Sequence, residues 1–173
     1  AIQFRKVRDI VLSDPSRRIV VISAAGKRDS GDHKITDLLY LCHAHLTYGV
    51  SCDEIFDRIR SRFVEIRDDL CLTYRIEDEL DALYSRLNKD MSIDELVSRG
   101  EYLTSRLMAE YLGYTFLDAG DCIFMDYDGK FQSEKIAVQF FLYSPKKWFT
   151  SSATFLHAPP WGRRQPPFAH RRS

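Results

Sequence analysis

The chain has 173 residues, of which 45% are apolar, a length and composition that suit one domain with its own core and exclude a disordered protein. Seven of the 25 basic residues follow Glu134 and none of the 25 acidic residues does, so residues 1–134 carry a formal charge of −7 although the whole chain is neutral. An acidic body of this kind disfavours general binding to nucleic acid.

Two further features bear on the compartment of the protein. No apolar run approaches the roughly 20 residues of a membrane-spanning helix, and the N-terminus lacks the basic-then-apolar layout of a secretory signal. The four cysteines form no Cys-x-x-Cys pair, so a disulfide framework is not expected. We therefore expect a cytoplasmic protein with no membrane partner.

The first predicted elements are a helix and a buried strand. Four apolar residues lie near one face of the helix, which ends in a turn at residues 14–16: Ile2, Val7, Ile10 and Val11. Residues 19–22 form a uniformly apolar, β-branched run, which is typical of a strand covered on both faces. Such a strand favours a parallel α/β sheet.

Three helices are predicted after a small, polar loop at residues 24–34. The first has an apolar repeat that runs from Ile35 to Gly49. The second follows a capping box formed by Ser51 and Glu54, and its apolar stripe consists of Ile55, Ile59, Phe63 and Ile66. A third helix carries Ile76, Leu80, Leu83 and Leu87.

A fourth helix starts at a second capping box, Ser92 with Glu95, passes through Gly100 and ends at Gly113. Residues 115–117 and 122–125 are short strand candidates separated by a turn at residues 118–121. Asp128 and Gly129 predict a further turn.

The character of the chain changes at about Ile136. Five of the six prolines, both tryptophans and no carboxylate lie in the remainder. Proline doublets break both helices and central strands, so we expect an irregular or disordered tail from about Ser144. We therefore divide the chain into a domain at residues 1–135 and a Pro/Trp/Arg-rich tail at residues 136–173. One hypothesis for the tail is a gene interrupted near Lys135 and read out of frame beyond it.

The segment from the strand at residues 19–22 to the following helix offers the clearest chemistry. The strand delivers Ser23 to small residues that let a ligand approach the backbone, and a helix that begins near Thr36 directs free N–H groups at an anion. An ordinary strand–loop–helix connection, with Thr36 as a simple N-cap, fits the same residues. Spacing alone does not separate the two.

This segment resembles the aspartate kinase branch of the amino acid kinase family. The pattern there is a buried strand, Ser-Ala, a Gly-containing loop, then Thr-Asp or Thr-Asn and Leu-Leu. The matching residues here are Ser23, Ala24, Gly26, Thr36, Asp37, Leu38 and Leu39.

A second match lies about 65 residues further on. Gly100 and Glu101 resemble the family's Gly-Glu-x-x-Ser motif, with Thr104 in the serine position. The resemblance implies that Glu101 pairs with the α-ammonium of aspartate and that the hydroxyl of Thr36 binds its carboxylate end. Outside that resemblance, Glu101 reads as a solvated helix residue. Asp118 and Ala119 resemble the family's Asp-Ala turn.

The resemblance covers about residues 1–135 and implies both a fold and an activity. The fold is a helix-rich α/β chain forming part of a three-layer αβα sandwich. The activity is the conversion of ATP and L-aspartate to 4-phospho-L-aspartate, the first step of lysine, threonine and methionine biosynthesis. The implied aspartate-binding residues are Ser23, Thr36 and Glu101, supported by Gly26, Asp37, Gly100 and Thr104.

The sequence departs from the family in two places. It starts after the family's first strand and its Lys-Phe-Gly-Gly loop, and it lacks the later Gly-Arg-Gly-Gly-Ser-Asp segment and the nucleotide-binding half. Catalytic residues are therefore not assigned. We expect ATP and Mg²⁺ to serve the complete enzyme, and this chain alone to bind neither tightly and to be inactive.

Two alternatives come from the residues themselves. A metal site is not expected, because His43 and His45 point to different sides of a helix and Asp118 and Asp121 are typical turn formers. The serious rival to the kinase hypothesis is a non-catalytic helical interaction module or gene remnant, whose bare strand edges would make it self-associate. Binding of aspartate distinguishes the two.

Overall fold

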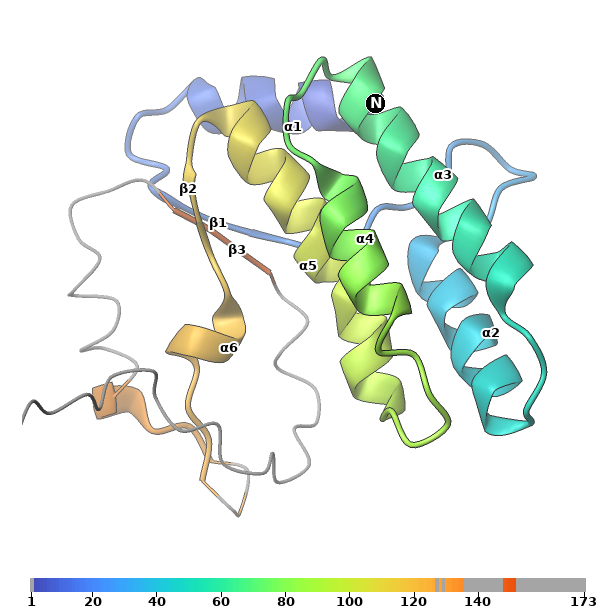
Figure 1. Cartoon of the computed structure of the whole chain (residues 1–173). Helices are drawn as coiled ribbons and strands as arrows, with labels where there is room; N and C mark the ends of the chain where they lie inside the picture. The colour runs from blue at the N-terminus through green and yellow to red at the C-terminus, as the bar shows by residue number, and fades with distance from the viewer. Residues whose placement is uncertain (1, 127, 129, 136–147, 152–173) are drawn as a thin grey trace, which may run out of the picture.

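The computed structural model describes residues 2–126, 128, 130–135 and 148–151 (Figure 1). Among these residues, none of the helices combines the length and apolar character that a membrane crossing needs. In chain order the elements are α1 (Ile2–Leu12), β1 (Ile19–Ile22), α2 (Ile35–Thr47), α3 (Asp53–Asp69), α4 (Ile76–Tyr84), α5 (Ile93–Leu112), β2 (Thr115–Leu117), α6 (Ala119–Cys122) and β3 (Trp148–Ser151).

The strands form one small parallel sheet in the order β1-β3-β2. Strand β3 is the middle strand, with Trp148 opposite both Ile19 and Thr115. The predicted parallel α/β arrangement is confirmed. The expectation of an irregular tail is wrong for residues 148–151, which are a strand, while residues 136–147 and 152–173 lie outside the described residues.

Helices cover one face of β1. Val20 and Ile22 pack with residues of α1 and α5. Ile19 and Val21 lie on the opposite face of the strand and are 56% and 54% exposed. The expectation that both faces of β1 are covered is therefore wrong for the described residues. The three-layer sandwich stays a prediction, because the described part shows the sheet and the helices on one side of it.

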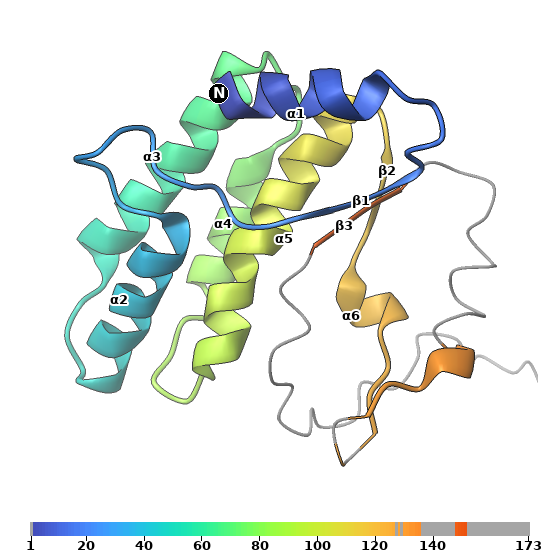
Figure 2. The same cartoon turned by 180° about the vertical axis from the view of Figure 1, so that it is seen from behind.

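The main core lies among four helices. Helices α2, α3, α4 and α5 lie side by side in both views (Figures 1 and 2), and their apolar stripes face inward. The predicted stripe on α3 is confirmed. The largest fully buried side chains in this core are Ile35, Leu39, Phe56, Ile59, Phe63, Ile76, Leu80, Leu96, Leu103 and Leu107.

The inward face of α1 differs from the predicted one. Ile2 and Ile10 are 73% and 61% exposed, and Phe4, Val7 and Val11 pack inward instead. Residues 4, 7 and 11 also follow a helical spacing, so the apolar pattern of this segment allows two faces. Val7 and Val11 belong to both faces, and packing against α5 selects the one that contains Phe4.

Helix ends agree with the sequence in some places and not in others. Ser92 caps α5, its hydroxyl accepting from the N–H of Glu95 at 3.1 Å, and Gly113 ends α5 in the left-handed region at φ 68°. The predicted box at Ser51 is wrong, because Cys52 is the N-cap of α3 and the Ser51 hydroxyl accepts from Asp53.

The chain after β2 also departs from the prediction. The predicted turn at residues 118–121 opens α6 instead, with Asp118 as its N-cap, and Cys122 ends that helix rather than starting a strand. Met125 forms a single antiparallel bridge with Phe131 around the turn predicted at Asp128.

Candidate functional site

The end of β1 meets the start of α2 through the backbone. The N–H of Ile35 donates to the carbonyl of Ala25 at 3.3 Å, which closes the loop at residues 24–34. Thr36 is half-buried in the first turn of α2, and the N-cap position belongs to Lys34, which makes no side-chain cap. Thr36 is therefore not the N-cap. The N–H of Ile35 is bonded to the loop and that of Leu38 donates to the carbonyl of Lys34 at 3.2 Å, so an anion at this end of α2 would meet the N–H groups between them.

Gly100 brings α5 against both of these segments. A Cβ at this position would lie 3.1 Å from Cβ of Ala24, 3.1 Å from Cδ1 of Leu39 and 3.2 Å from Cγ2 of Ile35. These distances are tighter than most side-chain contacts, so glycine allows the close approach and a larger residue would require the neighbours to shift. The Gly-Glu motif therefore lies where β1 ends and α2 begins.

Thr104 fixes this junction one turn further along α5. Its buried hydroxyl accepts from the N–H of Ala25 at 3.0 Å and donates to the carbonyl of Gly100 at 2.7 Å. A serine would offer the same hydroxyl, which explains why threonine can replace the serine of the motif. Thr104 is thus a structural support rather than a ligand-binding group.

Glu101 is half-buried beside the same junction. Burial raises the pKa of its carboxyl, and the backbone N–H groups of Glu101 and Ala24 offset only part of this effect. One carboxylate oxygen, Oε2, is buried and has no hydrogen-bond partner among the described residues. A buried carboxylate oxygen without a partner lowers the stability of the fold unless a cation or a hydrogen-bond donor binds it.

The structure brings together the neighbours of the three predicted binding residues. Ala24, Ile35 and Gly100 are in contact, and Ser23, Thr36 and Glu101 each lie beside one of them. Ser23 is exposed at the end of β1, and Asp37 is exposed in the first turn of α2. That these side chains bind a ligand stays a prediction.

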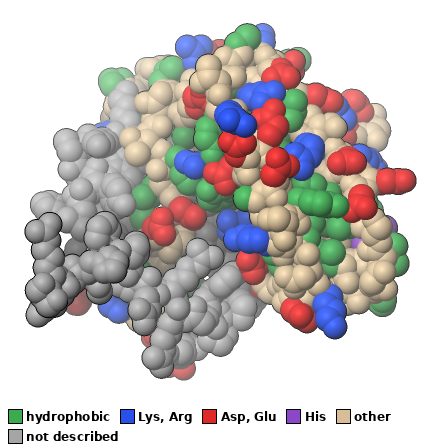
Figure 3. Space-filling view, in the orientation of Figure 1, with side chains coloured by type: hydrophobic (Ala, Val, Ile, Leu, Met, Phe, Trp, Pro, Cys, Tyr) green, Lys and Arg blue, Asp and Glu red, His purple; other side chains and the backbone are tan. Residues whose placement is uncertain are grey.

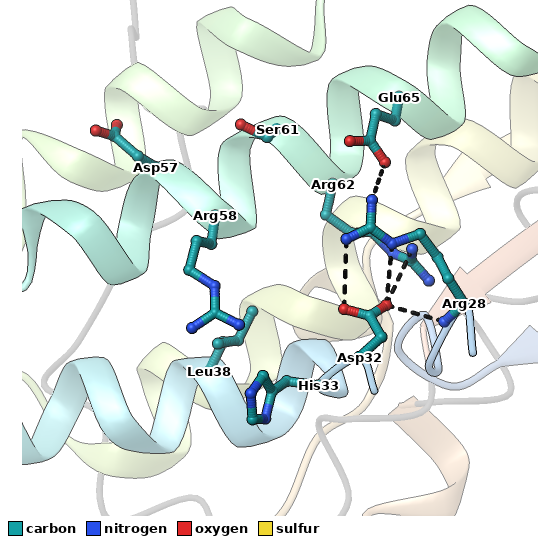
Figure 4. Close-up of a pocket in the computed structure, with 9 residues that line it drawn as sticks. All are labelled: Arg28, Asp32, His33, Leu38, Asp57, Arg58, Ser61, Arg62 and Glu65. Carbon is teal, nitrogen blue, oxygen red and sulfur yellow. Dashed lines mark hydrogen bonds and ion pairs between the residues drawn. The ribbon is translucent and has the colours of Figure 1, made fainter. Parts of the chain in front are cut away.

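Sequence reasoning missed an arginine that holds the loop at residues 24–34. The guanidinium of Arg62, on α3, donates to the carbonyl of Gly26 at 2.8 Å. It also pairs with Asp32 at 3.1 Å (Figure 4). Arg62 is only 8% exposed. A signal was present, because Arg62 lies between Ile59 and Phe63 on the apolar side of a predicted helix.

Two cavities lie near this region, and neither is lined by Ser23, Thr36 or Glu101. The first, of about 210 Å³, is lined by the ion pairs between the loop and α3 (Figure 4). The second, of about 250 Å³, lies between α4, α5 and Asp118. The predicted binding residues therefore coincide with neither of these two cavities.

The distribution of charge and of metal-binding side chains indicates no second site among the described residues. Acidic and basic side chains are interspersed over the face that Figure 3 shows. In the part of the chain that the structure describes, no three His, Cys, Asp or Glu residues gather as a metal site. The ring of His43 instead contacts the carbonyl of Met91, and that of His45 the carbonyl of Ser51.

Comparisons with known proteins agree on one class of enzyme. No family model matches the chain. Aspartokinase 3 of Bacillus subtilis (strain 168) is 35% identical over 118 residues, which are 65% of this chain and 26% of that protein. The solved aspartate kinase of Clostridium acetobutylicum superposes with a TM-score of 0.78 at 37% identity, covering 86% of this chain and 35% of its own.

A second solved enzyme is more distant. Aspartokinase III of E. coli, in complex with aspartate and ADP, gives a TM-score of 0.65 at 26% identity and covers 86% of this chain and 36% of its own. The chain thus spans about a quarter of the curated relative and about a third of the solved structures.

Proposed function

We propose that this chain, which corresponds in sequence and fold to one part of the aspartate kinases, binds L-aspartate at the junction of β1, α2 and α5. The observation that carries the proposal is the buried Oε2 of Glu101, which has no hydrogen-bond partner in the described part of the chain. An α-ammonium group is the cation that an amino acid would bring to it, and a charge-assisted hydrogen bond would compensate the burial. The solved E. coli relative was determined in complex with aspartate.

In this proposal, hydrogen-bond donors bind a carboxylate of aspartate. The first turn of α2 carries the hydroxyl of Thr36 and the N–H groups of Thr36 and Asp37, and the hydroxyl of Ser23 follows β1. Hydroxyls and helix N-terminal N–H groups suit a carboxylate. A carboxylate facing Glu101 would instead be repelled, so the arrangement supports one orientation of the ligand.

Phosphoryl transfer is not assigned to the described residues. The reaction needs cations and backbone donors over the phosphates of ATP, together with Mg²⁺. Arg28 and Arg62, the arginines that hold the loop at residues 24–34, are both paired with Asp32. We expect no aspartate-dependent release of ADP from the 173-residue chain alone. Turnover at ordinary kinase rates would contradict this.

Calorimetry with two ligands tests the binding proposal. Succinate has both carboxylates of aspartate and lacks the ammonium group. We expect the chain to prefer L-aspartate, and Glu101→Gln to weaken aspartate binding about tenfold to a hundredfold and to abolish the preference. Glu95→Gln, a half-buried acidic residue on the same helix, is the matched control and should bind as wild type does. Equal binding of both ligands by wild type would refute the role of Glu101.

One observation favours a second candidate, self-association through the sheet. Ile19 and Val21 project from β1 with more than half of their surface exposed. Exposed apolar strand residues favour association with another chain. We expect sedimentation to show self-association that the pair Ile19→Thr and Val21→Thr abolishes, and a monomeric wild type would refute this candidate.

A further inference from the structure

The loop at residues 24–34 is attached to α3 by four charged side chains (Figure 4). From α3, Arg62 reaches the carbonyl of Gly26 at 2.8 Å and the carboxylate of Asp32 at 3.1 Å. From the loop, Arg28 pairs with Asp32 and with Glu65, one turn after Arg62. The loop therefore touches α3 at two successive turns.

Asp32 organises these contacts. Its carboxylate accepts from the backbone N–H of Arg28 at 2.9 Å and from the side-chain Nε at 3.1 Å, in addition to Arg62. The backbone N–H of Arg28 and the neighbouring guanidinium groups hold the pKa of Asp32 well below its ordinary value, against the effect of burial. Asp32 is thus ionised at neutral pH and orients the guanidinium of Arg62.

The position of Gly26 depends on Arg62 more than the position of Ala25 does. Ala25 is held on two sides, by Thr104 and by Ile35. Gly26 is exposed, and a Cβ built on it would meet no atom within 4 Å. Packing therefore does not restrain Gly26 in the described structure, and the hydrogen bond from Arg62 fixes its carbonyl.

Resting on the proposed function, we propose that Arg62 is a positioning residue for the aspartate site. It contacts no substrate and acts by holding Gly26, two residues after the Ala24 N–H that faces Glu101. Gly26 directly follows Ala25, so losing the bond from Arg62 removes one of the contacts that hold the backbone from Ala24 to Gly26, beside those of Ala25 with Thr104 and Ile35. The buried guanidinium of Arg62 thereby holds the backbone that borders Glu101.

Three variants of this network test the proposal. Arg62→Met removes both contacts, Arg62→Lys retains one charged donor, and Glu65→Gln removes a partner of Arg28 while leaving the bond to Gly26. We expect Arg62→Met to weaken aspartate binding about tenfold and to raise the hydrogen-exchange rate of the Ala25 amide about tenfold. Arg62→Lys should recover part of both effects, and Glu65→Gln should change neither.

The readouts separate positioning from general stability. All variants are measured well below their melting temperatures, and Arg62→Met should still prefer aspartate to succinate because Glu101 is intact. Unchanged affinity and unchanged exchange at Ala25 in folded Arg62→Met would overturn the proposal. If wild type binds no aspartate, the proposed function fails, and the exchange of Ala25 alone then decides whether Arg62 holds the loop.

Discussion

Two half-buried glutamates on neighbouring helices have opposite surroundings. Glu79, on α4, accepts hydrogen bonds from the hydroxyl of Tyr74 at 2.6 Å and from Arg106 at 3.0 Å, and Tyr102 lies at 3.4 Å. Glu101, on α5, has a buried oxygen with no partner among the described residues. Similar burial therefore leaves one carboxylate satisfied within the chain and the other in need of a partner.

The pKa values of the two groups follow from this difference. Burial acts to raise the pKa of Glu79, but its hydrogen bonds outweigh burial and the pKa is lowered. Burial also raises the pKa of Glu101, and there the net shift is upward. A carboxylate whose partners lie inside the fold contributes to stability, whereas one without them is available to a ligand.

The largest expected effect on stability follows from removing the guanidinium of Arg106, which pairs with Glu79. Arg106 lies over the rings of Phe116 at 4.6 Å and Tyr74 at 5.0 Å as well as pairing with Glu79. We expect Arg106→Met to lower the free energy of unfolding by about 2–3 kcal/mol, less than for a fully buried pair. Urea denaturation measures this.

A matched control for that variant is the exposed pair of Arg75 and Asp78. Its side chains are 80% and 59% exposed, so Arg75→Met should change the unfolding free energy by less than about 0.5 kcal/mol. Equal effects of the two variants would show that Glu79 is not held as the structure describes.

The next largest effect is expected for a substitution beside Glu101 on α5. Gly100→Ala introduces a Cβ into contacts of 3.1–3.2 Å. We expect a loss of about 1–2 kcal/mol in stability, despite the better helix propensity of alanine, and weaker aspartate binding. Removing the methyl group of the facing residue with Ala24→Gly should restore part of both. Wild-type stability in Gly100→Ala would refute the close approach of α5.

Local patterns predicted much of the fold and of the candidate site. The apolar run of β1, the stripe of α3, the cap at Ser92 and the spacing of Gly100 and Thr104 are each contained within a few residues. Features of this kind depend on residues that are close in the sequence, so they can be predicted without knowing the fold. Contact between Gly100 and Ala24 then follows from the size of glycine.

Features that depend on distant partners were not predicted. Arg62 binds Gly26, which is 36 residues away, and no local rule indicates such a pair. Strand β3 lies in a segment whose composition suggests irregular structure, yet it pairs with strands far earlier in the chain. The exposure of Ile19 and Val21 likewise depends on which elements cover the sheet.

A smaller effect of opposite sign is expected at Glu101. Glu101→Gln removes a desolvated charge whose Oε2 has no partner among the described residues, so we expect stability at neutral pH to rise by about 0.5–1 kcal/mol while aspartate binding falls. Glu79→Gln weakens three hydrogen bonds and should lower stability instead. Paired urea titrations compare the two. A loss of stability in Glu101→Gln would mean that Oε2 also has a partner within the chain, against the described structure.

The smallest expected effect is a difference in how the two glutamates respond to pH. The pKa of Glu101 is raised above its ordinary value of 4.5, so its favourable contribution to folding is present below that value and is lost as pH rises through the raised pKa. The pKa of Glu79 is lowered from the same value, so its contribution is present above 4.5 and is lost as pH falls through the lowered pKa. Relative to Glu101→Gln, wild type should therefore lose stability as pH rises from about 4 to 7, and relative to Glu79→Gln it should gain stability over the same range. Urea titrations of the three proteins across this range measure both differences, and slopes of the same sign would contradict the distinction between a satisfied carboxylate and one that awaits a ligand.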